Sequence, residues 1–143
     1  MTILDIKLMP DEILRKKAKF VNPISNEILH LLDDMAETMY DAPGLGLAAN
    51  QIGILKRLIV VDCSSNEEDS KLWKMINPEI VSFSDKKEEL EEGCLSIPDH
   101  KAIVKRPLRI SVSYTNIEGG KNSMEATGLL AACIQHEIDH LNG

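Results

Sequence analysis

Two histidines and a glutamate in one short segment carry the clearest chemistry in this sequence. His136 and His140 are four residues apart, and Glu137 directly follows the first of them. On an α-helix, residues with this spacing lie on one face, one turn apart, so both imidazoles can reach the same metal ion. Glu137 can then reach a water molecule bound to that ion. The spacing therefore predicts a metal site with a base beside it.

The surroundings of this motif favour a metal site over a chance match. Residues 128–141 are apolar on nearly every side, which is typical of a helix inside a domain. Burying two histidines, Glu137 and Asp139 in such a helix without partners would be costly. Asp139 is expected either to orient a ligating histidine or to form a structural salt bridge.

A catalytic metal needs a third protein ligand and an open coordination position. Cys133 is seven residues from His140, about 10 Å along a helix axis, whereas metal–ligand bonds are roughly 2.0–2.3 Å long. Three residues along one straight helix therefore cannot converge on one ion, and the third ligand must come from another element. The candidates are Cys94, His100, His30, Cys63 or a carboxylate.

The residues around Cys94 favour it among these candidates. Gly93 permits close approach of the backbone, and Leu95 offers an adjacent N–H group. A separate segment, residues 44–51, contains glycines and alanines that suit a tight wall beside a ligand, and Gln51 adds an amide donor. Alone, that segment predicts only a turn between a helix and a strand, and it lacks the lysine of a phosphate-binding loop.

Together, these segments resemble the three signatures of peptide deformylases. They are GLGLAANQ at 44–51, EGCLS at 92–96 and QHEIDH at 135–140. The resemblance runs along the whole sequence, so residues 1–143 are expected to form a single peptide deformylase-like catalytic domain. It implies a metal-dependent hydrolase that removes the N-formyl group from N-formylmethionine of newly made polypeptides and releases formate.

The resemblance also implies the metal ligands and the base. Cys94, His136 and His140 would hold one divalent cation, commonly Fe(II) in this family, with zinc, nickel or cobalt as replacements. Such a site keeps a position for water, whose pKa the metal lowers. Glu137 would act as general base while that water attacks, and then as general acid.

The remaining roles follow from the same resemblance. Gln51 and the backbone N–H of Leu95 would stabilise the oxyanion. Separately from the resemblance, Glu92 is expected to pair with Arg106 as support for the site. The pocket for the methionine side chain would involve Leu45, Leu129, Ala132, Cys133 and His136, and Gly44 and Gly46 would also contact the substrate.

Two other functions compete with this interpretation. A zinc endopeptidase of the HExxH kind would need a third histidine or glutamate ligand and would cleave internal peptide bonds. A metal-bound scaffold without activity is the second alternative. Glu137 argues against a scaffold, since a structural site has no use for a base beside the metal.

Composition narrows the partners. The 143 residues carry 16 basic and 23 acidic side chains, a net charge of −7, which disfavours nucleic acid as a partner. No apolar stretch is long enough for a membrane span, and no secretory signal is visible. Three widely spaced cysteines predict a reducing compartment, the cytoplasm. Members of the family that the sequence resembles usually continue into a further carboxy-terminal helix, which in bacterial forms helps docking on the ribosome, so the resemblance leaves ribosome docking doubtful for this sequence.

The elements that must position these residues follow from periodicity. Ser25 can cap a helix that runs to Asp41, with one apolar face. Residues 57–62, 76–83 and 108–115 are predicted strands, and the charged run 85–92 is typical of a solvated turn. The order of helix, strands and helix predicts an α+β fold, with mostly antiparallel β-sheets packed around a central buried helix that carries the HExxH motif.

Overall fold

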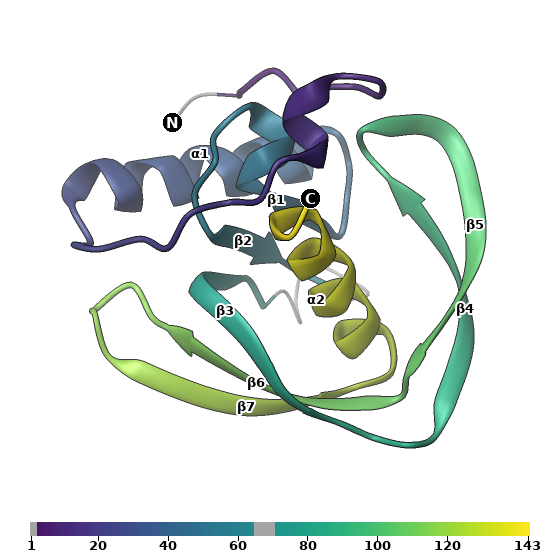
Figure 1. Ribbon diagram of the computed structural model, residues 1–143. Helices are drawn as coiled ribbons and strands as arrows, with labels where there is room; N and C mark the ends of the chain where they lie inside the picture. The colour runs from purple at the N-terminus through teal and green to yellow at the C-terminus, as the bar shows by residue number, and fades with distance from the viewer. Residues whose placement is uncertain (1–2, 65–70) are drawn as a thin grey trace.

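The computed structural model describes residues 3–64 and 71–143, and it places the predicted metal-binding helix at the centre of the fold (Figure 1). Five strands form one antiparallel sheet in the order β1-β2-β3-β6-β7, and β4 pairs with β5 in a separate two-stranded sheet. The elements are, in chain order, η1 (Glu12–Arg15), α1 (Asn26–Asp41), β1 (Gly46–Ala48), η2 (Ala49–Ile52), β2 (Leu58–Val61), β3 (Trp73–Phe83), β4 (Lys87–Cys94), β5 (Ile97–Pro107), β6 (Arg109–Thr115), β7 (Lys121–Thr127) and α2 (Gly128–Leu141).

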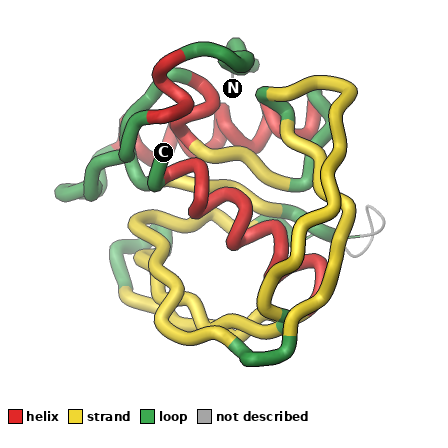
Figure 2. The backbone as a smooth tube through the Cα atoms, turned by 45° about the vertical axis from the view of Figure 1, so that its right-hand side comes forward, coloured by secondary structure: helices red, strands yellow, loops and turns green. Residues whose placement is uncertain are grey.

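Helix α2 has strands on more than one side, as the turned view in Figure 2 shows. It packs against the larger sheet through the buried side chains of Ala131, Ile134 and Ile138. The predicted class, α+β with mostly antiparallel sheets around a central helix, is confirmed. Among the described residues, neither helix is long and apolar enough to cross a membrane.

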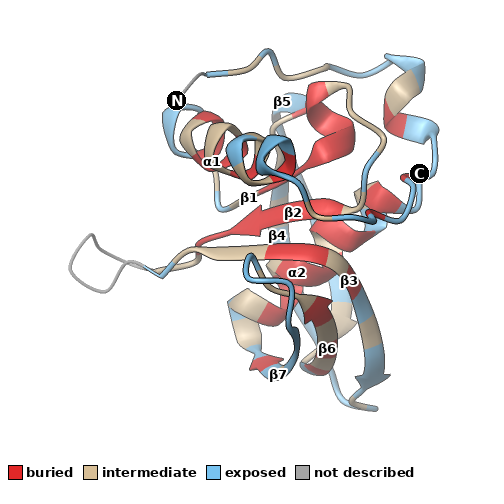
Figure 3. Cartoon of the chain, turned by 90° about the vertical axis from the view of Figure 1, so that its left-hand side faces the viewer, coloured by how far each residue is buried: buried red, intermediate tan, exposed pale blue. Residues whose placement is uncertain are grey.

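Strand β2 separates two hydrophobic clusters and is buried along its whole length (Figure 3). Ile59 and Val61 belong to the cluster that contacts α2, whereas Leu58 and Val60 belong to the cluster that contacts α1. Successive side chains of a strand point to opposite faces, so one strand can serve both clusters. This explains why its sequence is continuously apolar rather than alternating.

Helix α1 forms where the sequence predicts it. The Ser25 hydroxyl accepts a hydrogen bond from the N–H of Ile28 at 3.4 Å, as expected of a capping residue. Leu32, Met35 and Met39 of the predicted apolar face are fully buried. The helix ends at Asp41, just before the Ala42-Pro43 step.

The prediction of a solvated turn over residues 85–92 is wrong, because most of this run belongs to strand β4. Two of its acidic residues lie opposite cations of β5 in the register: Glu88 opposite Arg106 and Glu89 opposite Lys105. Opposite charges on facing residues stabilise a strand pair. A segment whose neighbouring acidic side chains repel one another can therefore still form a strand when its partner strand carries cations. The strand ends at Cys94, which brings this residue to the site.

Strand β3 is longer than predicted. It begins at Trp73 and continues through Asn77-Pro78, where the pairing with β6 shifts register. Proline has no N–H to donate, and strands tolerate it at such irregularities.

Candidate metal centre and active site

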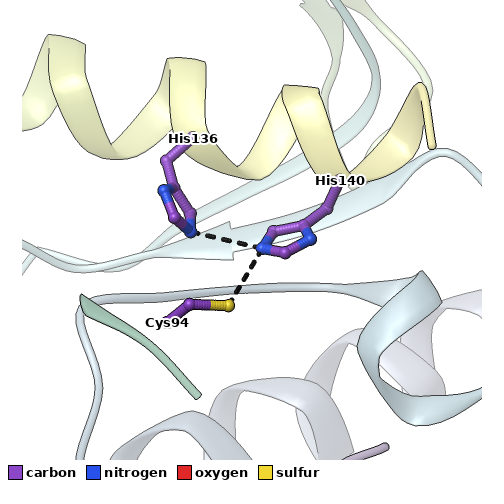
Figure 4. A group of neighbouring side chains, drawn as sticks. All are labelled: Cys94, His136 and His140. Atoms are coloured by element: carbon purple, nitrogen blue, oxygen red, sulfur yellow. Dashed lines mark hydrogen bonds between the residues drawn. The ribbon is translucent and has the colours of Figure 1, made fainter. Parts of the chain in front are cut away.

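Cys94, His136 and His140 lie together although they come from two distant parts of the chain. The Cys94 Sγ is 3.3 Å from His140 Nε2, which is 3.2 Å from His136 Nε2. Figure 4 shows both imidazoles pointing from one face of α2 toward Cys94. The three donor atoms lie within 4.8 Å of one another, and no other such group occurs in residues 3–64 and 71–143. His30, His100 and Cys63, the other candidates, are therefore outside it.

Burial shifts the pKa of two of these donors, Cys94 and His140. It raises the pKa of the Cys94 thiol, although a hydrogen bond from the Ser96 backbone partly opposes this. Burial, with the neighbouring His136, lowers the pKa of His140 to about 4. A neutral imidazole offers a lone pair to a cation, and a thiol loses its proton when a cation binds. One thiolate and two imidazoles are donors that suit iron, zinc, nickel or cobalt.

A chain of charged groups holds His136 in place. Its Nδ1 lies 3.0 Å from Glu92 Oε1. Arg106 donates two hydrogen bonds to Glu92, at 2.6 and 2.9 Å, and a third to Asp139 at 2.9 Å. Burial alone would raise the pKa of Glu92, but the hydrogen bonds from Arg106 and His136 lower it. The expected pairing of Glu92 with Arg106 is present, and Asp139 forms a salt bridge with Arg106.

Glu137 is a buried carboxyl with an unused oxygen. Its side chain lines the cavity beside the histidines, and Oε1 has no hydrogen-bond partner among the described residues. Burial, with Cys133 and Glu92 nearby, raises its pKa well above the ordinary value. A Cβ at Gly46 would lie 2.6 Å from Glu137 Oε2, so only glycine leaves room for this carboxyl. Such a group is suited to accepting and returning a proton.

The side-chain amide of Gln51 is held in one orientation. Its Oε1 accepts from the N–H of Ala48 at 2.9 Å, and its Nε2 donates to Ser96 Oγ at 3.2 Å. The same Nε2 lies 3.6 Å from Cys94 Sγ, so its N–H groups face the metal-binding cluster. Gln51 and Ser96 are each only 1% exposed, so water does not compete for this arrangement.

A cavity of about 1100 Å³ adjoins these residues. Cys133, excluded as a ligand from sequence geometry, forms part of its wall. Leu129 is 48% exposed there, so this part of α2 is not inside the domain. Every residue predicted to contact the substrate lines the cavity: Gly44, Leu45, Gly46, Leu129, Ala132, Cys133 and His136.

Some positions in the site could not be predicted from residue types. Ser96, the last residue of the segment around Cys94, orients Gln51 but had no predicted role of its own. Leu90 and Lys101 also line the cavity, as does His100, which was predicted only as a candidate metal ligand, because the β4–β5 sheet forms one of the cavity walls. Their position depends on the pairing of β4 with β5, which cannot be seen in residue types alone.

Comparison with known proteins agrees with this geometry. The profile of the family described as Polypeptide deformylase matches residues 3–143. The chain is 52% identical to the peptide deformylase of Rhizobium meliloti (strain 1021), covering all of this chain and 82% of that protein. The structure is similar to a peptide deformylase from Ehrlichia chaffeensis solved in complex with actinonin, with a TM-score of 0.94 and 42% identity over 99% of this chain and 85% of that one.

A second solved structure gives the same result. The peptide deformylase from Thermotoga maritima matches with a TM-score of 0.93 and 38% identity, over 99% of this chain and 93% of that one. Sequence profile, relatives and fold agree over nearly the full chain: it belongs to the polypeptide deformylase family.

Proposed function

We propose that this chain removes the N-formyl group from N-formylmethionyl peptides, which is the activity of its family. One observation carries the proposal: the side chains of Cys94, His136 and His140 have donor atoms close enough together to hold one metal ion, and they stand beside a buried carboxyl at the wall of a cavity. One oxygen of that carboxyl has no hydrogen-bond partner among the described residues. A structural metal site would not need such a carboxyl, whereas hydrolysis of an amide needs a group that can move a proton.

Cys94, His136 and His140 would hold one divalent cation, for which Fe(II) is our proposal. When bound, such a cation lowers the pKa of a coordinated water and polarises a carbonyl oxygen. Glu92, held by Arg106, keeps the His136 ring turned so that Nε2 faces the other two donors. Cys94 and His136 line the cavity, through which a substrate would reach the cation.

The chain's own residues then carry out the proton transfers. Glu137 takes a proton from the attacking water and later delivers it to the amine that leaves the formyl carbon. Negative charge develops on the formyl oxygen, which the N–H groups of Gln51 and Leu95 would stabilise. Loss of one such donor typically lowers kcat by about 10²–10³-fold.

The cavity wall would select the substrate. Leu45, Leu129 and Ala132 offer an apolar slot for the unbranched side chain of methionine. A Cβ at Gly44 would lie 2.8 Å from a methyl group of Leu95, so the wall is closely packed there. We propose that this packing leaves room for a formyl group but not for acetyl.

The substrates place the protein where polypeptides are made, and we propose the cytoplasm. Cys63, Cys94 and Cys133 are free thiols, as a reducing compartment requires. We propose no nucleic-acid or membrane partner.

An assay of anaerobically prepared, iron-loaded protein on formyl-Met-Ala-Ser tests this function. We expect formate release by the wild type, and loss of both bound iron and activity in Cys94→Ser. Cys63→Ser, which also removes one thiol, should retain the metal by elemental analysis. Absence of formate release from metal-loaded wild type would refute the proposal, as would a Cys94→Ser variant that keeps metal and activity. Cleavage of internal peptide bonds would instead indicate the endopeptidase.

A further inference from the structure

The last turn of α2 carries His140, and each backbone carbonyl of this turn has a partner. An α-helix leaves its last four carbonyls without partners inside the helix, so this is where helices tend to fray. Here the N–H groups of Asn142 and Gly143 donate to the carbonyls of the three residues before Leu141, at 3.1–3.2 Å. The carbonyl of Leu141 accepts from the N–H of Ala18 at 2.7 Å.

The guanidinium of Arg57 joins the two parts of this arrangement. Its Nη1 donates to the Leu141 carbonyl at 3.1 Å and to the Ala18 carbonyl at 3.4 Å, and its Nη2 donates to Asn142 Oδ1 at 2.9 Å. One side chain thus holds both the last carbonyl of the helix and the residue that caps two earlier ones. A cation at this end also interacts favourably with the helix dipole.

Arg57 extends from a fixed point of the backbone. Its N–H donates to the Lys19 carbonyl at 2.9 Å, and its own carbonyl accepts from the N–H of Asn77 at 2.7 Å. Strand β2 begins at the next residue, Leu58. Figure 1 shows the end of α2 close to the purple amino-terminal segment, to which Ala18 and Lys19 belong. The guanidinium therefore joins the end of α2 to two other segments of the chain, the amino-terminal segment at Ala18 and the residues that lead into β2.

The metal-binding cluster depends on the turn that Arg57 holds. His140 Nε2 lies between the other two donors, within 3.3 Å of Cys94 Sγ and 3.2 Å of His136 Nε2. A displacement of the last turn would move this atom away from both. We propose that Arg57 is a positioning residue for the metal centre, which fixes the end of α2 so that His140 stays within reach of the shared cation. This inference rests on the metal site of the proposed function.

Removal of the guanidinium tests the proposal, with a matched control next to it. Arg57→Gln loses the positive charge and cannot contact both the Leu141 carbonyl and Asn142 Oδ1 as the guanidinium does. Lys56→Gln loses one charge at an exposed neighbouring position. Cobalt titration, followed by visible absorption, should show binding about 10-fold weaker in Arg57→Gln, the lower range for loss of a group that supports a ligand. Lys56→Gln should bind as the wild type does. Arg57→Lys, which keeps the charge, should recover part of the loss.

Two further measurements separate positioning from a general loss of stability. In metal-free protein, hydrogen exchange of Arg57→Gln should be faster at the amides of residues 139–142 and unchanged at residues 131–134. In cobalt-saturated protein, kcat on formyl-Met-Ala-Ser should fall while KM stays within about twofold. The reason is that the cavity contacts the part of α2 from Leu129 to Glu137, which Arg57 does not touch.

The outcomes distinguish this inference from the proposed function. Wild type that binds cobalt, together with Arg57→Gln of equal affinity and equal exchange, overturns the inference alone. Wild type that binds no metal overturns the proposed function as well. If Arg57→Gln does not fold, Asn142→Ala removes one acceptor of the guanidinium at an exposed position. It should then show a smaller loss of affinity in the same direction, and an unchanged affinity would again overturn the inference.

Discussion

At the scale of single residues, the site holds a buried carboxyl that the fold leaves only partly satisfied. Burial raises the pKa of Glu137, and one of its oxygens has no hydrogen-bond partner among the described residues, which is costly for the folded state. Gly46 accommodates this carboxyl only because it lacks a Cβ. The two residues belong together, although 91 positions separate them in the sequence.

Replacement of Glu137 by glutamine should separate metal binding from catalysis. The amide keeps the size of the side chain but cannot accept the proton of an attacking water. We expect kcat to fall by about 10²–10⁴-fold, the usual contribution of a positioned base. Metal content by elemental analysis should stay that of the wild type. Glu88→Gln, an exposed change on β4, serves as the control, and full activity of Glu137→Gln would remove the residue from the mechanism.

At the scale of elements, β4 and α2 are joined by the charges that run from Asp139 through Arg106 and Glu92 to His136. The sequence predicts the pairing of Glu92 with Arg106 but not the strand that presents it. The reason is physical: the Ser25 cap and the apolar stripe of α1 are local signals, whereas β4 is stabilised by partners on β5. The acidic run of β4 resembles a solvated turn until those partners are known.

The metal centre, too, could be predicted only in part, because one of its residues is distant in the sequence from the other two. The helix period alone places His136 and His140 on one face, because their spacing is one turn. Cys94 is 46 residues from His140, and no periodicity relates the two. Residue types and the resemblance to a family indicated Cys94, and only the folded chain shows its distance from the imidazoles. Neither residue types nor the family resemblance indicated that Leu90 and Lys101 form part of the cavity wall.

The pairing of β4 with α2 predicts a pH dependence of stability. The folded state lowers the pKa of Glu92 through Arg106 and His136, so the folded chain favours the ionised carboxylate. The resulting stabilisation is complete above the pKa of a glutamate in the unfolded chain, about 4.3. It is lost as the pH falls through the lower pKa that Glu92 has in the folded chain. In metal-free protein, the thermal midpoint of Glu92→Gln should lie well below that of wild type near pH 6, and the difference should shrink toward pH 3.

Glu91→Gln provides the control for this experiment, because the exposed neighbour has no part in these hydrogen bonds. Its midpoint should follow the wild type across the range. A difference between Glu92→Gln and wild type that stays constant with pH would show that Glu92 does not stabilise the fold through its charge.

At the scale of the whole molecule, the two hydrophobic clusters on either side of β2 each stabilise a different helix. The cluster of Ile59 and Val61 supports α2, and the cluster of Leu58 and Val60 supports α1. Both are assembled from separate elements, so the sequence alone does not show which apolar residues share a cluster. Only the first lies directly beneath the helix that carries the two histidines. Stability and metal affinity should therefore be separable by truncation of one cluster or the other.

Ile134→Ala and Leu32→Ala test this division, since both side chains are fully buried, one in each cluster. Each truncation should lower the free energy of unfolding of metal-free protein by about 2–5 kcal/mol, as measured by urea denaturation. Ile134 lies on α2 two residues before His136, so its loss lets the helix shift relative to Cys94 and should also weaken zinc binding. Leu32→Ala should bind zinc as the wild type does, because α1 contributes no donor. Equal zinc affinities in the two variants would show that the clusters act as one core.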